Sequence, residues 1–217
     1  MIKKVKASLS EKILFLFLIC LSLFTFTSFY LLKNKCFFVK NINPDKISFS
    51  NPSNIAVMNV ECGNVIIELY PELSPNSVDR FKALIKKGSY NGSAFYKVIE
   101  NTLIHAGDLE FGNINNLNYP KIGSGKSGLG LLKSELNEEF QFTEGSIGLA
   151  RSDKFNTEDS EFFITLKEIP LYQGEYTPIG KVIYGLDALK KIKKGNYYPY
   201  VLDPDYINYF KLIEQYN

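Results

Sequence analysis

The first feature of the chain is a long apolar run. Positions 13–32 hold about twenty successive residues without a charge, between Lys12 and Lys33. A helix of that length spans roughly 30 Å at about 1.5 Å per residue, which matches the hydrocarbon thickness of a bilayer. The run is apolar all round, so a buried core helix is a poor alternative. We expect a short basic tail over residues 1–12 and a transmembrane signal-anchor helix over 13–32.

The residues around this run indicate its fate and its orientation. It ends in bulky side chains from Phe29 to Leu32, whereas a cleaved signal peptide ends near small residues. Retention as an anchor is therefore favoured over cleavage. Four lysines precede the run and three follow within eight residues. This small bias favours a cytoplasmic N-terminus, with the rest of the chain extracytoplasmic, in a periplasm or a secretory lumen.

Short strand patterns and turn residues alternate along the rest of the chain. Residues 33–54 carry repeated Asn and Pro and predict a linker. Two β-rich runs, Ile55–Val60 and Val65–Leu69, are separated by turn-forming residues and predict a hairpin. We expect further strands over 94–99, 146–150, 161–166 and 179–184.

Two helices are expected among these strands. Ser74 and Pro75 form a helix start, and apolar residues recur at helical spacing from Val78 to Ile85. A second pattern begins at Leu186. Many short strands with two helices favour a mainly β domain over residues 55–217, built on a closed or nearly closed antiparallel sheet.

Composition and cysteine content narrow the classes of function. Basic and acidic residues nearly balance, 25 against 23, and the basic residues are scattered, which argues against a nucleic-acid partner. Cys20, Cys36 and Cys62 lack the spacing of metal ligands, so we expect no metal. Cys36 and Cys62 are either two free thiols, which we favour, or a disulfide formed in an oxidising compartment.

Candidate chemistry is sparse in this sequence. His105 is the only histidine, so a pair of zinc-binding histidines is excluded. The glycine-rich stretch over 123–128 lacks the spacing of a phosphate-binding loop. Hydrolytic chemistry and nucleotide binding therefore have little support, and we expect no cofactor.

Five segments in a fixed order resemble the cyclophilin family of peptidyl-prolyl cis-trans isomerases. They are Ala94–Ile99, Ile104–Asp108, Gly145–Ser152, Asn156–Ile164 and Pro178–Asp187. The resemblance extends from about residue 55 to about residue 213. It implies a closed eight-stranded antiparallel β-barrel capped by two α-helices, which isomerises X-Pro bonds and assists protein folding. The implied partners are proline-containing peptides or unfolded protein segments, and we expect a monomer.

The resemblance also implies a groove on the outside of the barrel. Lys97 stands where the family has its catalytic arginine. The implied substrate-binding residues are Phe95, Thr102, Leu103, His105, Ala150, Arg151, Phe163, Leu171, Tyr172 and Tyr176.

Several of these positions depart from the family pattern. Lys97 replaces arginine, Thr102 replaces an aromatic residue, and His105 and Glu161 each replace glutamine. Lysine lacks the rigid planar fork of arginine, so we expect weaker catalysis. Outside its motif, Lys97 would be read as a strand lysine that extends to solvent. The alternative function is a catalytically weak or inactive module that binds proline peptides or assists assembly.

Overall fold

The N-terminal part of the chain is one long helix. The computed structural model describes residues 8–195 and 197–216, so residues 1–7 of the expected basic tail lie outside the described part. The chain divides into two compact units, residues 1–38 and 39–217. In the first unit, helix α1 (Leu9–Lys33) begins with a capping box between Ser8 and Glu11. Its span from Leu9 to Leu31 is long and apolar enough to cross a membrane, a property that a signal sequence shares.

The second unit begins earlier than the strand pattern indicates. We expected a linker over 33–54, but the compact unit starts at Val39. Ile42, Ile47 and Phe49 pack against buried residues of the first two strands. These apolar residues are spaced among Asn and Pro without a regular period, and for that reason the sequence pattern did not identify them as part of the domain.

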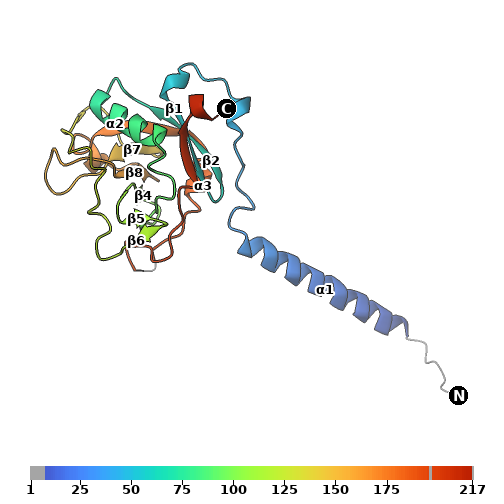
Figure 1. The fold of residues 1–217 in the computed structure, drawn as a ribbon. Helices are drawn as coiled ribbons and strands as arrows, with labels where there is room; N and C mark the ends of the chain where they lie inside the picture. Colours follow the sequence, from blue (N-terminus) through green and yellow to red (C-terminus); the bar gives the residue numbers. More distant parts are fainter. Residues whose placement is uncertain (1–7, 196, 217) are drawn as a thin grey trace. The chain divides into compact units, whose positions relative to one another are not determined.

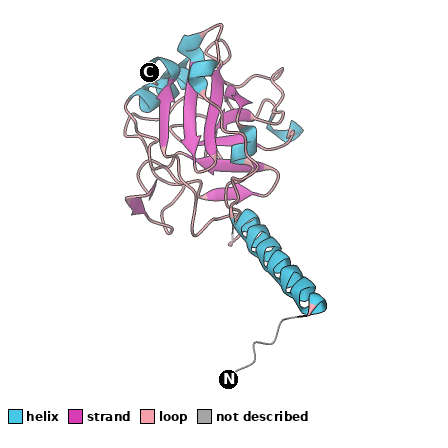
Figure 2. Ribbon diagram, turned by 90° about the vertical axis from the view of Figure 1, so that its right-hand side faces the viewer, coloured by secondary structure: helices cyan, strands magenta, loops and turns pink. Residues whose placement is uncertain are grey.

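The second unit is built on an eight-stranded antiparallel sheet with the order β10-β1-β2-β9-β7-β8-β4-β3. Figures 1 and 2 show the sheet from two sides. Its strands are β1 (Ile55–Val60), β2 (Gly63–Leu69), β3 (Lys97–Ile99), β4 (Leu103–Ala106), β7 (Ser146–Leu149), β8 (Phe162–Thr165), β9 (Pro178–Tyr184) and β10 (Tyr209–Leu212). A separate two-stranded ladder pairs β5 (Gly112–Asn113) with β6 (Asn116–Leu117).

The sheet curls into a half-barrel that is not fully closed. We expected a closed barrel, but within the described residues no strand ladder joins β3 to β10. Single backbone hydrogen bonds bridge this seam instead. The Val98 N–H donates to the Pro199 carbonyl and the Val201 N–H donates to the Tyr96 carbonyl, each at 2.9 Å. An irregular segment before β10 therefore occupies the place of a continuous ladder.

Two helices of the second unit pack against the sheet, as expected. Helix α2 (Pro75–Lys86) contacts β10, and the single turn α3 (Leu186–Leu189) contacts β2. Ser74 occupies the N-cap position of α2, but its hydroxyl donates to the Pro178 carbonyl and caps nothing. The Glu135 carboxylate accepts from the N–H groups of Asn76 and Ser77 instead. A loop residue distant in sequence thus caps the helix. The short 3₁₀ turns are Pro44–Lys46, Pro52–Asn54, Pro170–Tyr172 and Ile213–Gln215.

Aromatic rings fill the space between α2 and the sheet. Phe81 meets Phe162 edge to face at 5.2 Å between ring centroids, and both rings contact Tyr90 and Phe210. All four side chains are at most 1% exposed. Successive strand residues point to opposite faces, so Phe163 points away from this core. The alternation of Phe162 and Phe163 therefore places one ring inside the half-barrel and the next on its outer face.

The cysteines correct one of our expectations. Cys20 is a free thiol in α1, whereas Cys36 and Cys62 are each disulfide-bonded. We favoured two free thiols because nothing in the sequence demonstrates that the two residues are close. That preference was wrong, since neither of them is a free thiol.

Candidate active site

One row of side chains crosses the outer face of the sheet. Lys97 on β3 is the register partner of His105 on β4, and His105 is the partner of Phe163 on β8. Directly opposed residues of antiparallel strands point to the same face, with Cβ atoms about 4.5–5.5 Å apart. The strand register therefore sets a cation, an imidazole and an aromatic ring side by side.

The same row continues to Gly148 on β7, which is the register partner of Phe163. A Cβ atom at Gly148 would lie 2.5 Å from Cζ of Phe163 and 2.9 Å from Cε1 of Phe142. Only glycine fits here without displacing one of the two rings. This close approach fixes where the Phe163 ring can lie.

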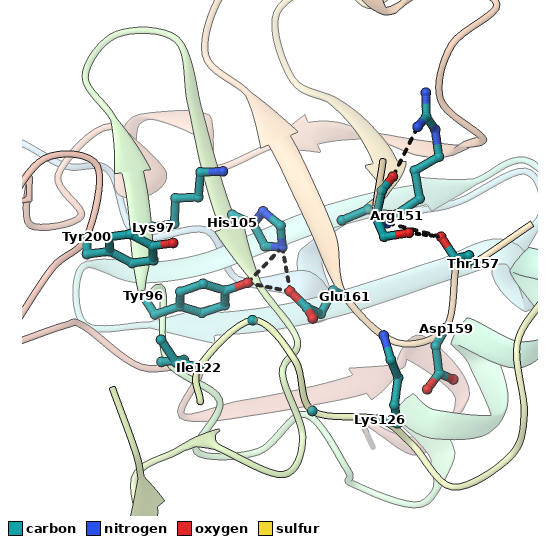
Figure 3. Close-up of a pocket in the computed structure, with 14 residues that line it drawn as sticks. Tyr96, Lys97, His105, Ile122, Lys126, Arg151, Thr157, Asp159, Glu161 and Tyr200 are labelled. Carbon is teal, nitrogen blue, oxygen red and sulfur yellow. Dashed lines mark hydrogen bonds and ion pairs between the residues drawn. The ribbon is translucent and has the colours of Figure 1, made fainter. Parts of the chain in front are cut away.

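A polar pocket of about 230 Å³ opens beside the row (Figure 3). The residues that line it come from β3 and the residue before it, from β4, from the loop between β6 and β7, from the connection between β7 and β8, and from the segment before β10. The complete lining is Tyr96, Lys97, His105, Ile122, Gly123, Gly125, Lys126, Ala150, Arg151, Ser152, Thr157, Asp159, Glu161 and Tyr200. The pocket therefore contains several charged groups within a small volume.

Tyr96, His105 and Glu161 form a hydrogen-bonded triangle in this pocket (Figure 3). His105 Nε2 lies 2.9 Å from Glu161 Oε2 and 3.2 Å from the Tyr96 hydroxyl. The Tyr96 hydroxyl also donates to Glu161 Oε2. Because a carboxylate only accepts, Nε2 carries a proton, and Nδ1 of the neutral ring is an acceptor.

Charge and burial shift two pKa values in the triangle. Burial by itself would raise the pKa of Glu161, but the hydrogen bond and charge of His105, the Tyr96 hydroxyl and the charge of Lys126 together lower it. Burial, followed by the charge of Glu161, raises the pKa of Tyr96 well above its ordinary value. At neutral pH the site therefore holds an ionised Glu161 and a protonated Tyr96.

An apolar cluster adjoins the polar pocket. Leu103, Phe142 and Phe163 form its buried centre, and Ala150 packs against it while also lining the pocket. The Phe163 ring contacts Tyr172 at 5.2 Å and Tyr176 at 5.1 Å between centroids. The cluster and the pocket therefore meet at Ala150.

The remaining residues expected at the groove are distributed unevenly. Arg151 lines the pocket, pairs with Glu175 at 3.1 Å and lies over the Tyr176 ring at 5.0 Å. Thr102 donates to the Glu100 carbonyl in the turn between β3 and β4 and does not line the pocket.

Two positions lie apart from both regions. Phe95 is completely buried, so its ring is not accessible to a peptide on the outer face. Leu171 is 84% exposed and is not among the residues packed against the apolar cluster.

Sequence reasoning missed two residues that take part in this arrangement. Phe142 completes the apolar cluster, and Lys126 lines the polar pocket. Both lie in the long connection between β6 and β7, which has no periodicity from which burial could be inferred. Within residues 8–195 and 197–216, no group of three His, Cys, Asp or Glu side chains could hold a metal ion.

Comparison with known proteins assigns the family. A model described as "Cyclophilin type peptidyl-prolyl cis-trans isomerase/CLD" matches residues 55–208. The chain belongs to this cyclophilin family. It is 39% identical over 150 residues to a "Probable peptidyl-prolyl cis-trans isomerase" of Brucella suis, covering 69% of this chain and 76% of that protein. It is 30% identical over 135 residues to the isomerase ppi1 of Schizosaccharomyces pombe, covering 60% and 79%.

Solved cyclophilin structures share the fold of the second unit. The Cryptosporidium parvum cyclophilin, crystallised in the presence of the dipeptide Ala-Pro, has a TM-score of 0.63 and 25% identity. The match covers 73% of this chain and 98% of that one. The enzyme class of this cyclophilin is therefore peptidyl-prolyl cis-trans isomerase, and the apolar helix α1 is an addition to the family domain.

Proposed function

We propose that this cyclophilin isomerises X-Pro bonds of peptides that lie across the outer face of β3, β4 and β8. The observation that carries the proposal is the row in which Lys97, His105 and Phe163 are cross-strand neighbours. The apolar part of this face would hold the prolyl ring. Leu103, Phe163 and Ala150 are the residues we assign to that role.

The reaction needs no nucleophile and no cofactor because no bond is broken. Rotation about a peptide bond costs about 18–20 kcal/mol, since twisting destroys amide resonance. An X-Pro bond isomerises uncatalysed in tens to hundreds of seconds. Catalysis requires a surface that binds the twisted amide more tightly than either planar isomer, and about 1.4 kcal/mol of that preference gives about tenfold in rate.

Lys97 is the residue we assign to stabilising the twisted amide. As resonance is lost, the lone pair of the prolyl nitrogen becomes available, and a nearby cation can donate to it. Lys97 is half-buried and lies in the same row as Phe163, with one strand between them, which supports this role. A lysine ammonium is a compact, strongly hydrated charge on a flexible stem, so it holds its donor less firmly than a guanidinium.

The test compares Lys97→Arg and Lys97→Met with the wild type. The assay follows isomerisation of a proline tetrapeptide by the full chain in nonionic detergent. We expect Lys97→Arg to raise kcat/KM about tenfold to a hundredfold and Lys97→Met to lower it, with smaller changes in peptide affinity. Lys133→Arg, at an exposed position outside the pocket, is the matched control. An unaccelerated rate at micromolar wild-type protein would refute the enzymatic proposal.

The second candidate function is a module that binds proline peptides with little or no turnover. Lys97, Thr102 and Glu161, which depart from the family pattern, favour it. The same experiment distinguishes the two functions. A silent wild type that binds the peptide, and that gains turnover in Lys97→Arg at unchanged affinity, would identify the binding module.

We further propose that α1 is retained as a membrane anchor and that the cyclophilin domain is extracytoplasmic and monomeric. Disulfide-bonded cysteines persist in oxidising compartments such as a periplasm or a secretory lumen, and Cys36 and Cys62 support such a location. Protease protection in intact and permeabilised cells tests the orientation. Digestion of the domain by a protease that reaches only the cytosol would refute the orientation, and release of a shortened mature protein would refute retention of the anchor.

A further inference from the structure

The polar pocket holds a different chemistry from the apolar cluster beside it. The two regions meet at Ala150, so a peptide whose proline lies at Phe163 has neighbouring residues that pass the pocket. Its lining includes four basic side chains, those of Lys97, His105, Lys126 and Arg151. The charge in the pocket that is left without a partner determines which peptide side chain fits there.

Both carboxylates of the pocket are already engaged. Asp159 accepts from Arg80 at 2.9 Å and from the Ser127 N–H at 2.7 Å. Glu161 accepts from Tyr96 and His105. Asp159 is therefore paired with a cation, and the Glu161 oxygen is hydrogen-bonded within the protein while the charge of Lys126 acts on it without forming an ion pair.

The cations of the pocket are matched less completely. The Arg151 guanidinium pairs with Glu175. Throughout the described part of the chain, no carboxylate forms an ion pair with the ammonium group of Lys97 or of Lys126. Lys97 is assigned to the prolyl nitrogen, so Lys126 is the cation left for another part of the peptide. Figure 3 shows its ammonium group pointing into the pocket on the side of Glu161.

The backbone on both sides of Lys126 is fixed by buried carboxylates. On one side, the Gly125 N–H donates to Asp108 Oδ2 at 3.2 Å, and Asp108 is completely buried. On the other side, the Ser127 N–H donates to Asp159, which is 4% exposed. The loop thus holds the Lys126 Cα at one place while its side chain stays free to meet a ligand.

Gly125 is part of this arrangement. A Cβ atom at this position would lie 2.0 Å from Asp108 Oδ1, so a larger residue cannot occupy it without displacing the loop. The close approach of backbone and carboxylate sets the point from which the Lys126 side chain extends.

We propose that Lys126 selects substrates that carry an acidic side chain close to the proline, and this inference rests on the proposed peptide-binding function. The carboxylate of the substrate would lie in the polar pocket against the Lys126 ammonium while the prolyl ring lies at Phe163. Ser152 and Thr157 also line the pocket, but their hydroxyl groups already bond to each other. Thr157 also donates to the Lys154 carbonyl, so Lys126 carries the selection. Lysine side chains at this position of a substrate would be disfavoured by like charge.

The test uses the full chain in nonionic detergent and a matched set of proline peptides. The peptides differ at one residue, which is Asp, Asn or Lys, placed in turn at each position from three before to two after the proline. At one position we expect kcat/KM of the Asp peptide to exceed that of the Asn peptide about twofold to fivefold. This is the range that a partly exposed ion pair contributes. The ratio should fall toward 1 in 0.5 M salt because mobile ions screen the pair.

Variants of Lys126 decide the assignment. Lys126→Gln should bring the Asp-to-Asn ratio to about 1. Lys126→Glu should lower that ratio below 1 and make the Lys peptide the preferred substrate. Lys133→Gln, outside the pocket, should keep both the ratio and the activity of the wild type. A ratio of about 1 at every position in the wild type, or a ratio that survives Lys126→Gln, would overturn the proposal.

The readout separates this inference from the enzymatic proposal. If the Asn peptide is isomerised but the Asp-to-Asn ratio is about 1, only the selectivity of Lys126 fails. If no peptide is isomerised, the dissociation constants of the same peptides are compared instead. The same two- to fivefold preference, lost in Lys126→Gln, would then support the selectivity in a protein without turnover, and equal constants would overturn it.

Discussion

Replacing Glu161 with glutamine tests the hydrogen-bonded triangle of the pocket. The Glu161 side chain is 12% exposed, and one of its oxygens receives donors from both Tyr96 and His105. A hydrogen bond to a charged group contributes about 1.5–3 kcal/mol, and a neutral one about 0.5–1.5 kcal/mol. Two charge-assisted bonds become neutral ones in Glu161→Gln. We therefore expect the free energy of unfolding at pH 7 to fall by about 2 kcal/mol.

The direction of the Glu161 pKa shift determines how the stability difference between wild type and Glu161→Gln changes with pH. The pKa of Glu161 is lowered in the folded state, against an unfolded value of about 4.3. The stabilisation from its carboxylate is therefore fully present above about pH 4.3 and is lost as the pH falls through the folded-state pKa. The difference in stability between wild type and Glu161→Gln should shrink toward zero over that acidic range.

The measurement is urea denaturation of a fragment of residues 34–217, followed by tyrosine fluorescence because the chain has no tryptophan. It is made at pH 7 and at steps down to pH 3. Glu175→Gln is the matched control. The Glu175 side chain is 53% exposed and pairs with Arg151, so its replacement should lower the free energy of unfolding by less than about 1 kcal/mol. A Glu161→Gln effect equal at pH 3 and pH 7, or no larger than that of the control, would contradict the reasoning.

Three further predictions concern the groove, a buried ion pair and the N-terminal helix. Gly148→Ala should destabilise the domain by about 1–3 kcal/mol in urea and weaken proline-peptide binding, since its Cβ would lie 2.5 Å from Phe163; an unchanged midpoint would count against this packing. Arg80→Ala should cost about 3–5 kcal/mol because it leaves the buried carboxylate of Asp159 without its cation, whereas Asp159→Asn in the same background should recover part of the loss. Deleting α1 should move the protein from the carbonate-resistant membrane pellet to the supernatant, and a protein that stays in the pellet would show another membrane contact.

Most of the long regular elements and the strand alternation could be predicted from the sequence, although no strand was expected from its pattern at β4, β5 or β6. Helix α2 begins at Pro75, as its start signal indicates, and Phe162 and Phe163 point to opposite faces. These features depend on local spacing, which a single sequence displays directly.

The parts contributed by loops could not be predicted in this way. Phe142 and Lys126 lie in an irregular connection, and Glu135 caps a helix from 59 residues away. Each depends on where a distant loop crosses the sheet, and no local pattern records that crossing. The open seam has the same origin, since the irregular residues before β10 bridge β3 only through long-range hydrogen bonds.

The position of β10 has a consequence for how the protein is made. β1 forms a ladder with β10, and roughly 150 residues separate the start of one from the start of the other. At about 5–20 residues per second, a ribosome needs about 8–30 s to synthesise that stretch. During this interval the nascent chain carries β1 with one edge unpaired, a template for association with other chains. The first strand of this isomerase therefore stays open to association with other chains until the last strand has been made.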